Sequence, residues 1–378
     1  MQVANFASPY AGNLIPSLRV LGERLASEGY RQVLALPARA RQRAWLAALE
    51  RDGVPVRLLP DGGSELRQAW AIAAIARREN AVALHAHFAG CQVAAWVAAR
   101  LLRLRSFGRQ RCEVIWHIHS SGATDRRLAR LRGWPKYFLM SGSVRAVAVS
   151  PGCLESVVQR GMARERIRVI LNGIDIARAT RHEHAREDVR RELGIGAEAT
   201  VLLLFGYAPH IKGVDVAVRA MQSLAPKRGD LRLVVVGREA TAACLREILG
   251  GRLPDAVQLV PPRECVADYY AAADAYLIPS RSEGMPYGVL ESLANGLPVI
   301  GSDIPGLAWA KGAPNLFLFP TEDADALART IVAVTGRATD EARAQREAAQ
   351  RFVRDRYSLD RWATEMMQYY RETVLVRA

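Results

Sequence analysis

The sequence predicts an α/β protein built from two Rossmann-like domains. Short apolar runs alternate with helical segments through both halves of the chain. Strands that are buried on both faces and separated by helices are typical of parallel sheets, and two such series indicate two domains. The length of 378 residues agrees, because it exceeds one compact core, and half of the residues are apolar.

The predicted strands of the first half are short apolar runs that end at turn or helix signals. They are Gln2–Ala7, Gln32–Ala38, Val54–Leu59, Ala81–His87, Val114–Ile118, Arg145–Val149 and Ile167–Ile170. The predicted helices between them are Leu18–Ser27, Arg41–Glu50, Leu66–Arg78 and an alanine-rich helix before the fifth strand. An Asn-Gly turn signal at Asn172 follows the last of these strands.

The second half repeats the alternation. Its predicted strands are Thr200–Phe205, Leu231–Val236, Val257–Val260, Ala275–Ile278 and Pro298–Ile300. Residues 179–199 are polar and lack a strand, which suits a linker and the first helix of the second domain. We therefore expect domains at 1–175 and 176–358. The last helix, Leu359–Thr373, carries more aromatic and methionine side chains than a free tail should expose, so residues 359–378 are expected to pack against a domain.

The net charge of +14 comes from the first half of the chain. Residues 1–180 hold 27 Lys and Arg against 12 Asp and Glu, whereas residues 181–378 hold 25 against 26. The densest basic stretch, residues 100–136, contains Arg100, Arg103, Arg105, Arg109, Arg111, Arg126, Arg127, Arg130, Arg132 and Lys136. Such a face suits an anionic membrane, a pyrophosphate-linked lipid or an acidic glycan; the alternative is an ordinary solvated surface. Nucleic acid is not expected, because aromatic residues are not interleaved with the arginines.

Composition also bears on location. No apolar run reaches about 18 residues, so no spanning helix is expected, and the first residues do not resemble a signal peptide. The five cysteines are scattered and form no C-x-x-C pair, which favours reduced thiols over a zinc site or a disulfide framework. These observations favour a cytoplasmic protein, with peripheral contact at the inner membrane face as the further expectation.

The most informative segment contains two carboxylates eight residues apart, Glu283 and Glu291. The first lies in a Pro/Gly-rich turn and the second about two turns into the helix that follows. The backbone N–H groups at a helix start bind anions, whereas carboxylates suit hydroxyl groups. Phosphate on the N–H groups and sugar hydroxyls on the acids together describe a nucleotide sugar. The alternative is that the acids only favour the positive end of the helix.

This segment resembles the E-x7-E motif of retaining GT-B glycosyltransferases of family 4, also called group 1. The resemblance implies that Glu283 faces the donor sugar and that Glu291 binds the ribose. It also implies two domains facing across a cleft, a final helix that crosses back to the first domain, and catalysis without a bound metal or cofactor. The donor diphosphate is then expected on the segment Gly284-Met285-Pro286-Tyr287-Gly288.

A second motif follows the first strand of the second domain. A glycine at a strand end, Gly206, lets a ligand approach the backbone, and Lys212 can place a charge on phosphate. The family pattern is Gly-Arg…Lys-Gly, with both basic residues on the diphosphate. Tyr207 stands where the arginine is expected, so phosphate neutralisation is incomplete unless His210 or another basic group substitutes.

Histidines end two neighbouring strands of the first domain. Alternation places His117 and His119 on the same face, and ligands of such sheets bind beyond the carboxyl ends of the strands. By resemblance His119 lies near the reaction centre, with His117 as the second choice. His85 and His87 show the same spacing one strand earlier. A metal held by all four histidines is the alternative, and we favour a structural role for His85.

Two further positions follow from the resemblance. Gly12, in the turn after the first strand, would approach the donor phosphates and the acceptor; this turn is not a G-x-G-x-x-G fingerprint, so NAD binding is not expected. Nucleobase recognition would fall on backbone groups at Pro261, Pro262 and Arg263. The side chains at these positions therefore do not indicate which base is bound.

The sequence therefore predicts a retaining hexosyltransferase that moves a sugar from a nucleotide sugar, with a UDP-sugar favoured, to a glycan, lipid-linked or small-molecule acceptor. Two alternatives stay open. A nucleotide-sugar epimerase would need acid/base carboxylates in the first domain, which the sequence hardly offers. A non-catalytic pseudo-glycosyltransferase that only binds a nucleotide sugar is supported by Tyr207.

Overall fold

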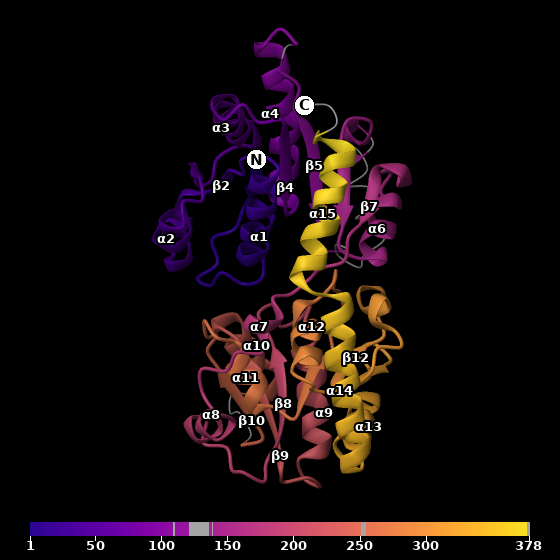
Figure 1. Ribbon diagram of the computed structural model, residues 1–378. Coiled ribbons are helices and arrows are strands. Elements are labelled where there is room, and N and C mark those ends of the chain that lie inside the picture. The colour runs from indigo at the N-terminus through magenta and orange to yellow at the C-terminus, as the bar shows by residue number, and fades with distance from the viewer. Residues whose placement is uncertain (109, 121–135, 138, 251–254, 376–378) are drawn as a thin grey trace. The chain divides into compact units, whose positions relative to one another are not determined.

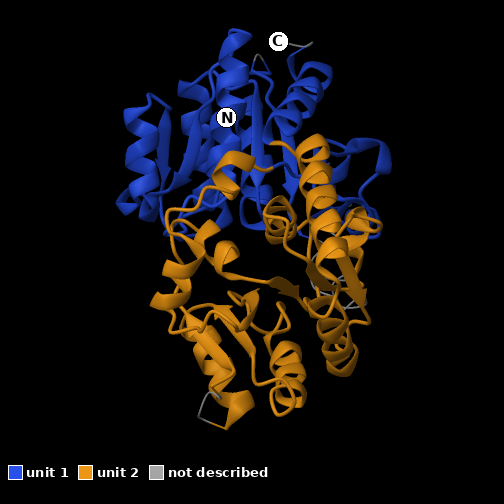
Figure 2. Ribbon diagram, turned by 60° about the horizontal axis from the view of Figure 1, so that its bottom comes forward, with its two compact units in different colours: residues 1–173, 359–378 blue, residues 174–358 orange. Residues whose placement is uncertain are grey.

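The computed structural model describes residues 1–108, 110–120, 136–137, 139–250 and 255–375. It divides into two compact units, shown in Figure 2. The first unit combines residues 1–173 with residues 359–378, and the second is residues 174–358. Each unit contains one parallel sheet, so the prediction of two Rossmann-like domains is confirmed.

The first unit contains a seven-stranded parallel sheet in the order β3-β2-β1-β4-β5-β6-β7, counted over the described residues. The strands are β1 (Gln2–Ala4), β2 (Leu34–Pro37), β3 (Val56–Leu59), β4 (Ala83–His87), β5 (Glu113–Ile118), β6 (Arg145–Ala148) and β7 (Ile167–Val169). The strand order reverses between β1 and β4, and this switch point is where ligands of doubly wound sheets bind.

Helices flank this sheet (Figure 1). They are α1 (Leu14–Ser27), α2 (Ala44–Arg51), α3 (Glu65–Arg78), α4 (Ala89–Arg105), α6 (Pro151–Val158) and α15 (Leu359–Thr373). Helix α1 begins four residues earlier than the sequence suggested, because Pro16 falls in its first turn, where a missing N–H is tolerated. Strand β1 is shorter than expected, and residues 5–13 form a loop between it and α1.

The C-terminal helix α15 is part of the first unit although it follows the whole second unit in the chain (Figure 1, yellow). Its residues Trp362, Met366 and Met367 are buried in one apolar cluster with Leu21 of α1 and Ile115 of β5. An ion pair between Arg24 and Asp360 joins the same two helices at the surface. This burial accounts for the apolar side chains that the sequence places in its last helix.

The second unit contains a six-stranded parallel sheet in the order β10-β9-β8-β11-β12-β13 among its described residues. The strands are β8 (Thr200–Phe205), β9 (Leu231–Val236), β10 (Val257–Val260), β11 (Ala275–Ile278), β12 (Val299–Ser302) and β13 (Leu316–Phe319). The helices are α7 (Ile176–Ala179), α8 (Arg186–Glu192), α9 (Val214–Leu224), α10 (Glu239–Leu249), α11 (Ala267–Ala272), α12 (Tyr287–Ala294), α13 (Ala324–Thr335) and α14 (Thr339–Arg356). The sequence analysis missed β13, a short edge strand whose first three residues are only partly buried.

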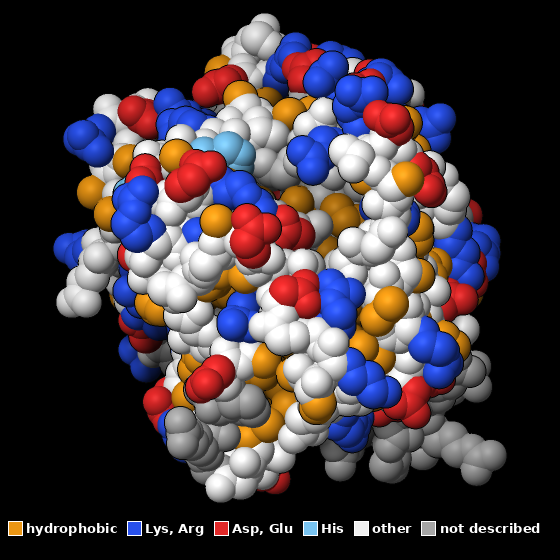
Figure 3. Space-filling model, turned by 90° about the horizontal axis from the view of Figure 1, so that it is seen from below, with side chains coloured by type: hydrophobic (Ala, Val, Ile, Leu, Met, Phe, Trp, Pro, Cys, Tyr) orange, Lys and Arg blue, Asp and Glu red, His pale blue; other side chains and the backbone are white. Residues whose placement is uncertain are grey.

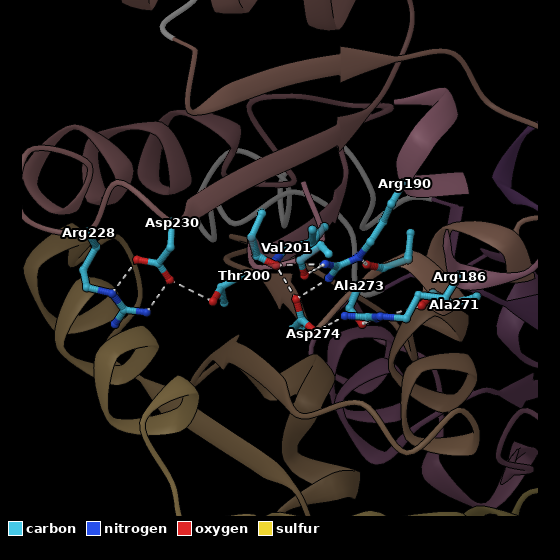
Figure 4. A network of polar contacts seen from close by, with 12 residues as sticks. Arg186, Arg190, Thr200, Val201, Arg228, Asp230, Ala271, Ala273 and Asp274 are labelled. Carbon is cyan, nitrogen blue, oxygen red and sulfur yellow. Dashed lines mark hydrogen bonds and ion pairs between the residues drawn. The ribbon is translucent and has the colours of Figure 1, made fainter. Parts of the chain in front are cut away.

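A polar network ties α8 to the amino ends of β8 and β11 (Figure 4). The carboxylate of Asp274, just before β11, accepts hydrogen bonds from Arg186, from Arg190 at 2.7 Å and from the backbone N–H of Val201 at 2.7 Å. Arg190 is buried, and its remaining donors reach backbone carbonyls. The network thus lies at the amino edge of the sheet, opposite the carboxyl edge where ligands of such sheets bind.

Acidic and basic side chains are interspersed, rather than gathered by sign, on the face of the surface drawn in Figure 3.

None of the helices in the described parts of the chain has the length and apolar character needed to cross a membrane.

Candidate active site

The predicted donor residues converge at the carboxyl edge of the second sheet. The loop after β8 carries Gly206 and Lys212, and the loop after β11 carries Glu283 and leads into α12. Strands β8 and β11 are neighbours at the point where the order of this sheet reverses. The fold thus brings two motifs about 70 residues apart to the position where doubly wound sheets bind ligands.

A direct contact between the two motifs joins Lys212 and Glu283. The Nζ atom of Lys212 lies 2.6 Å from Oε1 of Glu283, and the Oγ atom of Ser280 donates to the same oxygen at 2.7 Å. The Glu283 side chain is 9% exposed and that of Lys212 is 27% exposed. The carboxylate is therefore held in one orientation beside a cation that keeps some access to solvent.

The second carboxylate, Glu291, lies in the second turn of α12 and is buried. Its Oε2 atom accepts a hydrogen bond from the hydroxyl of Tyr270 at 2.7 Å. Helix α12 begins at Tyr287 after Pro286, and the preceding Gly284 and Met285 are buried. Its first turn therefore presents backbone N–H groups, and the positive end of the helix dipole, to the same edge.

Tyr276 of β11 is a buried tyrosine that both carboxylates influence. Burial, and then the charges of Glu283 and Glu291, raise the pKa of the Tyr276 hydroxyl well above its ordinary value, so both carboxylates lie near this ring. Tyr276 fits there because residue 288 is glycine: a Cβ atom on Gly288 would lie 2.4 Å from the hydroxyl oxygen. The sequence analysis missed Tyr276 and Tyr270, because aromatic residues in strands and helices look like ordinary core.

Two glycines allow the loops to approach each other. Gly213 has a φ of +64°, and a Cβ atom there would lie 1.9 Å from the carbonyl oxygen of Pro279. A Cβ atom on Gly306 would lie 2.3 Å from the carbonyl oxygen of Glu283. Both close contacts are with backbone, which cannot move aside as a side chain can. These glycines therefore fix the positions of the Lys212 and Glu283 loops.

An arginine fastens the same loops together. Both terminal nitrogens of Arg281 bond Asp215 of α9 at 2.8 Å, and one of them also donates to the carbonyl of His210. The backbone N–H of Arg281 donates to the carbonyl of Ile211. Bidentate pairing of this kind is geometrically specific. It lowers the pKa of Asp215, so the carboxylate stays charged and the loop stays attached.

Tyr207 stands at the end of β8, where the family pattern has arginine. The residue is 45% exposed, and its ring stacks on Phe205 with centroids 5.9 Å apart. His210, the candidate substitute, is exposed.

At the proposed base-binding position, the carbonyl of Pro261 already accepts a hydrogen bond from the hydroxyl of Tyr269 at 2.5 Å, and the guanidinium of Arg263 lies over the Tyr269 ring.

The remaining predicted site residues, Gly12 and His119, belong to the first unit. Gly12 has a φ of +57° in the loop before α1. His119 follows β5, and its ring stacks on His117 with centroids 4.3 Å apart and planes 8° apart. Burial lowers the pKa of His119 to about 4, although its ring keeps some exposure. His119 is therefore neutral at physiological pH.

A cavity of about 230 Å³ lies at the carboxyl edge of the first sheet. It is bounded by the ends of β1 to β3 and the start of α4, and its polar lining includes Asn5, Arg39 and Glu65. Arg39 is held by hydrogen bonds to Asn5 and Asp61. The cavity offers both donors and acceptors, which suits a ligand rich in hydroxyl groups.

The basic stretch 100–136 is only partly described. Arg109 and the arginines at 126, 127, 130 and 132 lie outside the described residues. In the described part, Leu104 and Phe107 are 73% and 95% exposed beside Arg100 and Arg103. The expectation of a membrane contact stays a prediction.

Two family models match the chain in succession. "Glycosyltransferase Family 4" matches residues 17–178, and "Glycosyl transferases group 1" matches residues 199–336. The two matches fall on the two sheets, and the second includes the motifs that carry Lys212, Glu283 and Glu291.

Curated relatives match part of the chain. The putative teichuronic acid biosynthesis glycosyltransferase TuaC of Bacillus subtilis is 31% identical over 162 residues, which cover 42% of this chain and 39% of that protein. The D-inositol 3-phosphate glycosyltransferase of Jonesia denitrificans is 29% identical over 221 residues, 55% of this chain and 52% of that protein. The matched segments thus span about two fifths to one half of these relatives.

Solved structures match over nearly the whole chain. HepE of Anabaena in complex with UDP-glucose has a TM-score of 0.80 at 18% identity, covering 98% of this chain and 100% of that chain. WaaG, a glycosyltransferase involved in lipopolysaccharide biosynthesis, has a TM-score of 0.70 at 18% identity, with 97% and 99% covered. At these identities the likeness shows the fold alone, which is GT-B.

Proposed function

Because this chain belongs to the family 4, group 1 glycosyltransferases, we propose that it transfers a sugar from a nucleotide sugar to an acceptor hydroxyl. The observation that carries the proposal is the Lys212–Glu283 ion pair just before α12, with buried Glu291 in the second turn of that helix. A UDP-sugar is the donor we favour, since the similar structure of HepE holds UDP-glucose.

The leaving diphosphate is the group that this edge of the sheet can stabilise. Lys212 has three N–H donors and uses one of them on Glu283, so it can reach a phosphate oxygen without leaving the carboxylate. The first turn of α12 adds backbone N–H groups and a partial positive charge. Together they stabilise negative charge as the bond to the sugar breaks, and this proposal needs no bound metal or cofactor.

The carboxylates would orient the sugar and the ribose. Glu283 is fixed through Oε1 by Lys212 and Ser280, and in this proposal it accepts hydrogen bonds from sugar hydroxyls. Glu291, fixed by Tyr270, accepts those of the ribose. His119, which is neutral, keeps the role that the resemblance implies, that of a further contact to the sugar. The bond between the sugar and the diphosphate then breaks, and the acceptor hydroxyl bonds to the same face of the sugar while its proton passes to the departing diphosphate, so the configuration is retained.

The acceptor would bind to the first unit. The cavity lined by Asn5, Arg39 and Glu65 suits a glycan or a small polyol, with the loop that contains Gly12 beside α1. A lipid-linked acceptor would accord with peripheral contact at the inner, cytoplasmic membrane face through residues 100–136, where Leu104 and Phe107 are exposed. We include this contact and location in the proposal.

Release of nucleoside diphosphate from a panel of UDP-, GDP- and ADP-sugars tests the proposal. We expect slow release from one donor by the wild type, and a loss on the order of 100-fold in Lys212→Ala, because an electrostatic donor is removed. Lys227→Ala is the matched control, since Lys227 is an exposed lysine after the far end of α9. Equal rates in Lys212→Ala and the wild type would reject this donor site.

One alternative is that the chain binds a nucleotide sugar but does not transfer the sugar. Exposed Tyr207 carries no charge where the family places an arginine, which would favour a pseudo-glycosyltransferase that binds a nucleotide sugar without turnover. The same panel separates the two, provided that candidate acceptors are included. A donor that stabilises the protein against heating, yet releases no diphosphate with any acceptor, would support the alternative.

A further inference from the structure

A row of buried polar side chains crosses the first sheet and ends at His119. Gln32 lies just before β2, Gln2 is in β1, His87 ends β4 and His119 follows β5, so the row spans four neighbouring strands. Gln32, Gln2 and His87 are 6%, 3% and 1% exposed. A buried polar group is costly unless it is hydrogen-bonded, so the partners of each group restrict its orientation.

The hydrogen bonds of the row have a fixed direction. The amide nitrogen of Gln32 donates to the carbonyl of Leu18 at 2.6 Å, and a carbonyl can only accept. The amide oxygen of Gln32 therefore accepts from the amide nitrogen of Gln2 at 3.1 Å. The amide oxygen of Gln2 then faces Nε2 of His87 at 3.0 Å, so this nitrogen carries the proton.

The same reasoning decides which ring nitrogen of His119 carries the proton. Because Nε2 of His87 carries the proton, its Nδ1 atom is an acceptor in the neutral ring. This Nδ1 atom lies 3.2 Å from Nε2 of His119, which must therefore donate. His119 is then left with an unprotonated Nδ1 atom. A backbone carbonyl in α1 thus sets the tautomer of a histidine at the other end of the row.

We propose that Gln32 and Gln2 are positioning residues that hold His119 in the Nε2–H tautomer, which commits its Nδ1 atom to accept a hydrogen bond from a substrate hydroxyl. The substrate contact rests on the proposed function, whereas the tautomer does not. An unprotonated Nδ1 atom accepts from an O–H group but has no proton to donate to a phosphate oxygen. His119 would therefore select a sugar or acceptor hydroxyl over a phosphate group.

The surroundings keep the row in place. The amide nitrogen of Gln2 also donates to the hydroxyl of Tyr370 at 3.1 Å, so α15 covers the row. Gly22 of α1 makes room for the other amide, since a Cβ atom there would lie 2.8 Å from the amide nitrogen of Gln32. The row therefore depends on helices from both ends of the chain.

A metal site is the competing interpretation of these histidines. Nitrogen atoms of His85, His87 and His117 lie within 4.8 Å of one another. However, the rings of His85 and His117 are stacked with planes 9° apart, and those of His87 and His117 with planes 27° apart. The nitrogens of these rings are already paired with one another, Nε2 of His85 with Nδ1 of His117 at 3.2 Å and Nδ1 of His87 with Nε2 of His119 at 3.2 Å. The hydrogen-bonded row accounts for the cluster better.

The wild-type protein provides the first test. Long-range ¹H–¹⁵N spectra of the full chain labelled with ¹⁵N-histidine distinguish the two neutral tautomers, and His119→Asn assigns the signals. We expect a single Nε2–H tautomer for His119 between pH 6 and 8, unchanged by inorganic phosphate. An Nδ1–H tautomer, an even mixture, or protonation of His119 on adding phosphate would overturn the proposal. No substrate is used, so this result is independent of whether the chain transfers a sugar.

Substitutions then test the role of the amides. In Gln32→Met the Gln2 amide loses the partner that orients it, and we expect the His119 tautomer ratio to shift by about 5-fold or more. Gln92→Met, at a buried glutamine whose side chain bonds Lys136 instead, should leave the ratio unchanged. Gly22→Ala should shift the ratio in the same direction, and it serves if Gln32→Met does not fold. An unchanged ratio in a folded Gln32→Met or Gly22→Ala protein would refute the role of the amides.

Discussion

Mild acid should destabilise the first unit selectively, because it contains three buried neutral histidines. Burial holds the pKa of His85, His87 and His117 well below the ordinary value, and the neighbouring histidines add to the effect. The groups around them are one another, His119, the Tyr370 hydroxyl and the N-terminal ammonium, which also lowers the pKa of His85. These rings therefore stay unprotonated at a pH where unfolded histidine, with a pKa of about 6.5, takes up a proton.

The size of this loss of stability follows from the difference between the numbers of protons bound by the unfolded and the folded protein. A group whose pKa is depressed on folding loses its stabilising contribution as the pH falls through the unfolded value. Between pH 7.5 and 5.5, protonation favours the unfolded state by about 1.4 kcal/mol for each such histidine. His119, whose pKa is lowered to about 4, stays neutral in the same window, so the three buried histidines and His119 together should lower the free energy of unfolding of the first unit by about 5 kcal/mol. Carboxylates contribute little in this window, because their unfolded pKa values lie near 4.

Hydrogen exchange measured by mass spectrometry on the full chain resolves the two units. After correction for intrinsic rates, peptides from β1, β4 and β5 should show the loss, and peptides from β8 and β9 should serve as the internal reference. His117→Phe should reduce the loss to about 4 kcal/mol, since one titrating ring is removed. A loss below about 1 kcal/mol in the first unit, or an equal loss in both units, would refute the reasoning.

Three further substitutions test the donor site. Gly306→Ala should destabilise the second unit by about 1–3 kcal/mol in thermal melts, because its Cβ atom meets the Glu283 backbone; Gly196→Ala, with nothing within 4 Å, should not. Tyr270→Phe removes a donor to the buried glutamate of α12 and should weaken nucleotide binding about 2- to 10-fold by calorimetry; unchanged affinity would contradict that role. Tyr207→Arg restores the cation of the family pattern and should tighten nucleoside diphosphate binding about 10-fold, so weaker binding would show that the tyrosine itself contacts the ligand.

The sequence predicted the fold and the main donor motifs because both depend on local patterns. Alternating apolar runs identify parallel strands, and the spacing of Glu283 and Glu291 around a helix start marks a site. The proximity of Lys212 to Glu283 follows from the topology, since both lie after neighbouring strands of one sheet. The roles of these residues in binding a donor stay predictions.

Other features could not be inferred from local patterns. Tyr276 lies near both carboxylates only because Gly288, on another element, leaves space for its hydroxyl. The polar row in the first unit joins Gln2 to Tyr370, which are 368 residues apart in the chain. Neither glutamine of the row has a sequence signature, so only the packed structure shows that they orient a histidine.

Binding of UDP, GDP and ADP to the full chain, measured by calorimetry for the wild type and Glu291→Gln, tests the central claim most directly. Binding does not depend on finding the acceptor, and the substitution keeps the shape of the side chain while removing its charge. The account predicts that one nucleotide, UDP by preference, binds the wild type and binds Glu291→Gln about 10-fold more weakly. Equal affinity in both proteins, or binding of none of the three nucleotides, would contradict it.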